Sequence, residues 1–167
     1  MAETQVRMGE LAASAAAGDV LVALGLGSCI GLALLDRRNG VAGLAHVVLP
    51  ESGDAAAANK LKFADHAVPE LVSRVVAAGG RRPRLEAVVV GGASMFASAN
   101  ATLEVGQRNE AAVRERLKAL RIPVIAAETG GTRGRTLRVH VDTLEVTVRE
   151  AGGKDHEVVP ARAGVAA

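Results

Sequence analysis

The sequence contains no tryptophan and no tyrosine, and its only aromatic residues apart from histidine are Phe63 and Phe96. Binding of single-stranded nucleic acids and of sugars relies on aromatic faces, which this chain hardly offers. Lysine and arginine together number 20, against 18 aspartate and glutamate residues. The resulting net charge of +2 is too small for a nucleic-acid-binding surface. We therefore expect no nucleic-acid partner and no carbohydrate ligand.

Cysteine occurs once, as Cys29, so the chain cannot form an internal disulfide. This usage fits a reducing cytoplasm. One cysteine and four scattered histidines, with no short-spaced pair, do not make a zinc pattern, so we expect no metal site.

The longest uncharged stretch, residues 20–35, has 16 residues and is short for a membrane span. Residues 1–19 lack the apolar region of a targeting segment. We expect a cytoplasmic protein without membrane insertion.

The hydrophobic content of 49% and the length of 167 residues are typical of one globular domain. Short apolar runs predict buried strands. These runs cover residues 20–24, 30–35, 41–49, 85–90 and 124–127. Alternating apolar and polar residues over 137–141 and 146–148 predict two further strands, each with one solvent-facing side. Asn39 and Gly40 separate the second run from the third, a pair that favours a tight hairpin turn.

Two helices are also expected. Apolar residues between Leu61 and Val75 recur at helical spacing, although Pro69 predicts either a kink or a helix that starts near Asp65. Asn109 is a candidate N-cap for a second helix. Strands outnumber helices, so the fold class is predicted as α+β, with helices covering antiparallel or mixed sheet. We expect one domain over residues 1–150 and a flexible tail over residues 151–167.

Cys29 is the first candidate for chemistry, within Gly25-Leu26-Gly27-Ser28-Cys29-Ile30-Gly31. A free cysteine is more often a buried structural residue than a nucleophile. The flanking glycines, however, permit close approach of other backbone and leave amide donors free. A nucleophile beside free amides has the components of an oxyanion hole.

His46 is the natural partner of Cys29. If residues 30–36 and 41–48 pair as a hairpin, the end of the second strand returns toward the start of the first, which brings His46 near the thiol. An imidazole in hydrogen-bond reach lowers a thiol pKa and carries protons. The alternative is a histidine that merely faces water. That alternative suits the remaining histidines better: His66 lies in a predicted helix, His140 on the solvent-facing side of a predicted strand, and His156 in the tail.

Several blocks of the sequence resemble the CheD family of chemoreceptor glutamine deamidases. The blocks that carry the resemblance are GLGSCIG at residues 25–31, AHVVLP at 45–50, KFAD at 62–65, GGASMF at 91–96, GQRN at 106–109 and TGGTRGR at 129–135. They follow the family order and cover most of the chain. The Cys-to-His spacing of 17 residues makes the first two blocks specific.

The resemblance implies a bacterial cytoplasmic enzyme of chemotaxis that hydrolyses glutamine side-chain amides on methyl-accepting chemotaxis receptors to glutamate. It also implies a layered sandwich of two packed sheets flanked by helices, similar to bacterial toxin deamidases. Many members bind the CheC phosphatase, and some act on glutamyl methyl esters. Neither a metal nor an organic cofactor is needed. The family region that matches Phe96 is linked to partner binding, although a phenylalanine is more often a core residue.

The family triad is cysteine, histidine and threonine, and its first two members match Cys29 and His46. The third position is Ala23, which has no hydroxyl. The free imidazole nitrogen must then find water or a backbone carbonyl, and we expect about a tenfold loss of rate. Leu144 stands where the family usually has glycine.

Thiol-mediated amide hydrolysis follows as the leading hypothesis. Cys29 would attack the amide, and the turn Gly27-Ser28-Cys29, chiefly the Cys29 amide, would hold the oxyanion. Ala23 favours an alternative, in which a weakly active regulatory module docks on chemoreceptors or on CheC.

Overall fold

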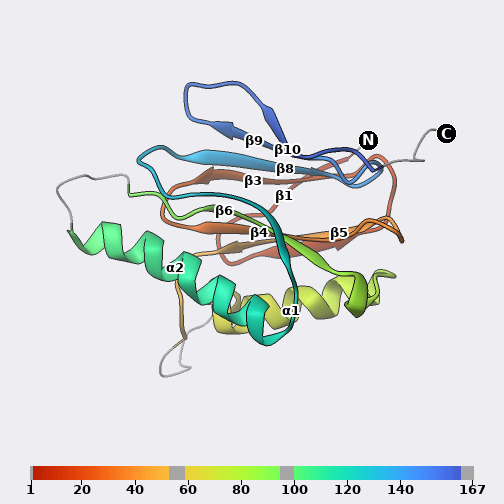
Figure 1. The fold of residues 1–167 in the computed structure, drawn as a ribbon, viewed down its shortest axis with the longest axis horizontal. Coiled ribbons are helices and arrows are strands. Elements are labelled where there is room, and N and C mark those ends of the chain that lie inside the picture. The colour runs from red at the N-terminus through yellow and green to blue at the C-terminus, as the bar shows by residue number, and fades with distance from the viewer. Residues whose placement is uncertain (1, 53–58, 95–99, 163–167) are drawn as a thin grey trace.

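The computed structural model describes residues 2–52, 59–94 and 100–162. Two five-stranded sheets and two helices form three layers, with both helices on the outer face of one sheet (Figure 1). The predicted α+β class and the two packed sheets with helices beside them are confirmed.

The first sheet has the strand order β1-β3-β8-β9-β10. Its strands are β1 (Glu3–Gln5), β3 (Val20–Leu26), β8 (Arg135–His140), β9 (Val146–Glu150) and β10 (His156–Val159). The pair β1–β3 is parallel and the other pairs are antiparallel, so the sheet is mixed. In β8 and β9 buried residues alternate with partly exposed ones, because one face packs on the second sheet and the other faces outward.

The second sheet has the order β2-β5-β4-β6-β7. Its strands are β2 (Leu11–Ser14), β5 (Val41–Val47), β4 (Ile30–Asp36), β6 (Glu86–Gly91) and β7 (Val124–Thr129). Strands β4 and β5 are buried along their whole length. One face packs against the first sheet and the other against the helices, which explains their nearly continuous apolar sequence.

The helices α1 (Ala64–Ala77) and α2 (Asn100–Ala119) cover the second sheet (Figure 1). Helix α1 begins at Ala64 and contains Pro69, which agrees with the predicted helix start near Asp65. The prediction for Asn109 is wrong, because α2 begins nine residues earlier and Asn109 lies in its interior. An asparagine before an apolar periodic run is the usual sign of an N-cap, but here the Asn109 side chain donates hydrogen bonds to the Ser28 and Val48 oxygens instead.

The chain beyond residue 150 corrects a second expectation. His156–Val159 form β10, which pairs antiparallel with β9, and the Val159 side chain is buried between the sheets. The prediction of a flexible tail from residue 151 does not hold for these four residues. The strand is too short to give a recognisable alternation, and only the pairing with β9 shows it.

Candidate active site

Cys29 lies in a three-residue turn between β3 and β4, at one end of both sheets. Each of the three backbone carbonyl oxygens of this turn accepts a hydrogen bond from another part of the chain. The Gly27 oxygen accepts from the Ala93 amide at 2.8 Å, and the Cys29 oxygen accepts from the Gly92 amide at 2.9 Å. The Ser28 oxygen accepts from the Asn109 side chain at 2.9 Å. The conformation of the turn is therefore fixed from outside by β6, by the residues after it, and by α2.

The amide N–H groups of the same turn have no such partners. Among the described residues, no backbone or side-chain acceptor takes a hydrogen bond from the N–H of Gly27, Ser28 or Cys29. Three donors without a protein partner next to a thiol are the components that sequence reasoning expected for an oxyanion hole.

The hairpin that should bring His46 toward Cys29 is present. Strands β4 and β5 pair antiparallel, with Ile30 opposite Val47 and Gly31 opposite His46. One further step of this register sets Cys29 opposite Val48, so His46 is its diagonal neighbour, about 7–8 Å away between Cα atoms. Both side chains belong to the face that meets the first sheet, since side chains alternate along each strand.

Gly31 separates the two candidate residues on that face. A Cβ atom at Gly31 would lie 2.8 Å from Leu26 Cδ1 and 2.9 Å from Leu137 Cδ2. The glycine thus lets side chains of the first sheet pack directly over the backbone between Cys29 and His46.

The His46 ring is buried, with 4% of the residue exposed. Its Nδ1 lies 3.0 Å from the backbone oxygen of Val6. A carbonyl oxygen only accepts, so Nδ1 carries the proton and Nε2 holds a free lone pair. Nε2 is buried and has no partner among the described residues. This is the tautomer that a general base needs.

Burial governs the charge of both groups. It lowers the pKa of His46, although the Val6 carbonyl and the nearby Glu10 carboxylate oppose the shift. It raises the pKa of the Cys29 thiol, whose residue is 8% exposed. The expected lowering of the thiol pKa by His46 is therefore wrong for this structure. The space between two sheets disfavours either charge, so the directions of both shifts favour a neutral thiol beside a neutral imidazole.

Sequence reasoning missed the segment Val6–Glu10. It crosses from β1 in the first sheet to β2 in the second and passes over His46. The Val6 amide donates to the Val22 oxygen at 2.7 Å, the Gly9 amide donates to the His46 oxygen at 3.0 Å, and the His46 amide donates to the Glu10 oxygen at 3.1 Å. The contact with His46 uses backbone atoms, so no residue type in the sequence could have signalled it.

Ala23 is fully buried in β3 and belongs to the same apolar cluster as Cys29 and Val6. A carbonyl already occupies the Nδ1 side of His46, as expected for a chain without the family threonine. Phe96 lies outside the described residues, so its role in partner binding stays a prediction.

The other histidines lie on other elements. His66 is on α1, with Nε2 3.1 Å from Ser52 Oγ, and His156 is on β10, with Nε2 2.6 Å from Glu128 Oε2. His140 ends β8. None of the three belongs to β4, β5 or the turn between β3 and β4.

A cavity of about 250 Å³ adjoins His46 and is lined by Gln5, Val6, Arg7, Met8 and Leu24. Met8 is 61% exposed and Leu24 45% exposed, so apolar side chains border its opening.

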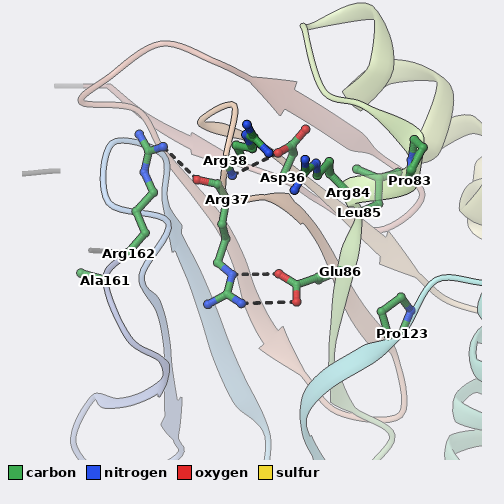
Figure 2. A pocket seen from close by; sticks show the side chains of 10 residues that line it. All are labelled: Asp36, Arg37, Arg38, Pro83, Arg84, Leu85, Glu86, Pro123, Ala161 and Arg162. Carbon is green, nitrogen blue, oxygen red and sulfur yellow. Dashed lines mark hydrogen bonds and ion pairs between the residues drawn. The ribbon is translucent and has the colours of Figure 1, made fainter. Parts of the chain in front are cut away.

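A larger cavity, of about 590 Å³, lies at the far end of β4 (Figure 2). Its centre is the ion pair of Arg37 with Glu86, at 2.8 Å. Its lining includes Pro83 and the exposed Arg84 of the Arg81-Arg82-Pro83-Arg84 stretch, and contains no cysteine or histidine. Asp36, at the end of β4, lines this cavity, and the six strand residues 30–35 separate it from Cys29, so the cavity takes no part in this site.

No group of three or more histidine, cysteine, aspartate or glutamate side chains able to hold a metal ion occurs in the part of the chain that the structure describes. Neither of the helices described there is long and apolar enough to cross a membrane.

Known proteins similar to this chain identify the family. The family model described as "CheD chemotactic sensory transduction" matches residues 48–150, which is more than half of the chain. A protein of Moorella thermoacetica named "Probable chemoreceptor glutamine deamidase CheD" is 45% identical over 136 residues, covering 79% of this chain and 81% of that protein. The chain belongs to the CheD family.

A relative from Clostridium botulinum strain Hall carries the same name. It is 41% identical over 137 residues, covering 80% of this chain and 85% of its own length. The match to the CheD family model begins at residue 48, so it does not include Cys29 or His46. The resemblance to CheD proteins expected from the sequence is confirmed.

Proposed function

We propose that this protein hydrolyses the side-chain amides of specific glutamines on methyl-accepting chemotaxis receptors, which yields glutamate and ammonia in the cytoplasm. Its CheD relatives are named as probable chemoreceptor glutamine deamidases, which supports this substrate. The observation that carries the proposal is the hydrogen bond from His46 Nδ1 to the Val6 oxygen. It leaves Nε2 as a buried, unprotonated base on the sheet face that also carries Cys29.

The reaction begins from the neutral pair. His46 Nε2 takes the thiol proton as the Cys29 sulfur attacks the glutamine Cδ carbon. The tetrahedral oxyanion accepts hydrogen bonds from the Cys29 amide and a neighbouring amide of the turn. The imidazolium then returns its proton to the nitrogen as the C–N bond breaks, and ammonia leaves a thioester.

The second half restores the enzyme. His46, neutral again, takes a proton from water as the water oxygen attacks the thioester carbon. Collapse of that intermediate breaks the C–S bond, and the imidazolium reprotonates the sulfur. The net change is glutamine plus water to glutamate plus ammonia, so no redox partner and no cofactor enter.

The cavity beside His46 is where the substrate side chain would enter. A glutamine on a receptor helix has a long, narrow side chain, which suits an opening bordered by Met8 and Leu24. The exposed Arg7 lies at the same opening and suits an acidic receptor surface.

Ala23, in place of the family threonine, supports a second candidate function: a weakly active module that docks on chemoreceptors or on the CheC phosphatase. Ammonia release from a purified receptor cytoplasmic fragment separates the two functions. Deamidation predicts release well above that of the fragment alone, and release that falls to the background with Cys29→Ala. Binding to the fragment with background ammonia from the wild-type protein would favour the docking module.

A further inference from the structure

Asn109 joins the two segments that carry the candidate catalytic residues. Its side-chain Nδ2 donates to the Ser28 oxygen at 2.9 Å and to the Val48 oxygen at 2.8 Å. Ser28 directly precedes Cys29, and Val48 lies two residues after His46. Both partners are carbonyls, so the donating atom is the amide nitrogen and both of its hydrogens are used. The residue is fully buried.

Helix α2 lies unusually close to this part of the backbone. Gly106 lies one turn before Asn109 on the same face of the helix. A Cβ atom there would lie 2.6 Å from the Gly92 oxygen and 2.9 Å from the Ala93 oxygen. The amides of Gly92 and Ala93 hold the Cys29 and Gly27 oxygens. Gly106 therefore lets α2 come within reach of the turn. Asn109 donates to the Ser28 oxygen, the one turn carbonyl that the residues after β6 do not hold.

The Ser28 carbonyl and the Cys29 N–H belong to the same peptide group. In a trans peptide these two bonds point in opposite directions, and no peptide bond in the described chain is cis. By holding the Ser28 oxygen toward α2, Asn109 directs the Cys29 N–H away from the helix. That N–H is the donor that the proposed mechanism assigns to the oxyanion.

We propose that Asn109 is a positioning residue for deamidation: it orients the Ser28–Cys29 peptide so that the Cys29 amide faces the oxyanion, and it ties this turn to the strand end that carries His46. The proposal rests on the proposed function.

The Asn109 side chain carries a cost in stability beside its two hydrogen bonds. Its Oδ1 is buried and has no hydrogen-bond partner among the described residues. A buried amide oxygen without a donor costs free energy; a leucine, which has the same branched shape but is larger, would avoid that cost but would not donate to the Ser28 and Val48 oxygens. Asparagine also has a lower helix propensity than leucine. The two donated hydrogen bonds are the property that only the amide provides.

The test compares two reactions of Cys29 in the variants Asn109→Leu and Asn109→Asp. Deamidation of a receptor fragment needs the oxyanion donor, whereas alkylation of the thiol by iodoacetamide forms no oxyanion. We expect kcat for deamidation to fall about ten- to a hundredfold, KM to change less than twofold, and the alkylation rate to stay within twofold. Asn39→Leu, at the far end of β4, is the matched control and should change none of these.

An unchanged kcat in a folded variant would overturn the proposal. A parallel loss of deamidation and alkylation, or failure of both variants to fold, would mark Asn109 as a structural residue and overturn it as well. If the wild-type protein releases no ammonia while its thiol is alkylated normally, the proposed function fails, and this inference fails with it. If the wild-type protein is active and the Asn109 variants have the same kcat, the proposed function stands and only the role of Asn109 is overturned.

Discussion

The imidazole Nδ1 of His46 donates its proton to the backbone oxygen of Val6, across 3.0 Å and between segments 40 residues apart in the chain. Val6 is itself held by β3, because its backbone amide donates a hydrogen bond to the Val22 oxygen. The histidine is thus oriented by backbone that bridges the two sheets. Because a backbone carbonyl already accepts from Nδ1, we expect the absence of a hydroxyl at position 23 to have a smaller consequence than the sequence suggests.

The variant Ala23→Thr measures that consequence. From the sequence alone, a restored hydroxyl should raise the rate about tenfold. With the Val6 carbonyl already on Nδ1, we expect less than about a threefold change in kcat, because a second neutral acceptor adds little. Ala23 is fully buried, so the added atoms should lower the melting temperature. Steady-state ammonia release and thermal unfolding check both effects, and a tenfold gain would show that the carbonyl does not orient His46.

His46→Ala should slow deamidation by about a hundredfold or more, the scale of a lost general acid–base group. His140→Ala, which removes a partly exposed histidine from β8, is the control and should leave the rate unchanged. Both variants should remain folded by circular dichroism. Equal losses from the two substitutions would undo the assignment of His46.

The pH dependence follows from the direction of the two pKa shifts. The proposed mechanism uses neutral His46, and burial lowers the pKa of this residue, so kcat/KM should rise with pH through a midpoint below about 6.5 and then level off. Burial raises the pKa of Cys29, so alkylation by iodoacetamide should have its midpoint above about 8.5, the ordinary thiol value. Pseudo-first-order alkylation rates and initial deamidation rates measure the two midpoints. A thiol midpoint near neutrality would instead indicate a preformed thiolate–imidazolium pair.

Much of the site follows from local sequence signals. Asn39 and Gly40 mark the hairpin turn, the runs on either side set the strands, and together they predict that His46 returns toward Cys29. The observed register, with Gly31 opposite His46, agrees with this. The glycines around Cys29 likewise predicted a turn with unpartnered amides.

The parts that sequence reasoning missed depend on backbone atoms or on distant packing. The Val6 carbonyl carries no sequence signature, and the raised pKa of Cys29 comes from burial between two sheets that no local pattern shows. Asn109 was assigned by its common role at helix ends, whereas its contacts lie 61 and 81 residues away in the chain. Leu144 shows a positive φ of 55°, which accounts for a glycine preference at this position, yet its side chain is buried in the core.

The most direct test of the proposed function is the mass of receptor peptides before and after incubation with the protein. Hydrolysis of one side-chain amide makes a glutamine peptide about one dalton heavier, through a step that needs the thiol nucleophile. We predict this gain at particular receptor glutamines with the wild-type protein and its absence with a folded Cys29→Ala variant. An unchanged mass with the wild-type protein, or the same gain with Cys29→Ala, would contradict the assignment of Cys29 as the nucleophile of a glutamine deamidase.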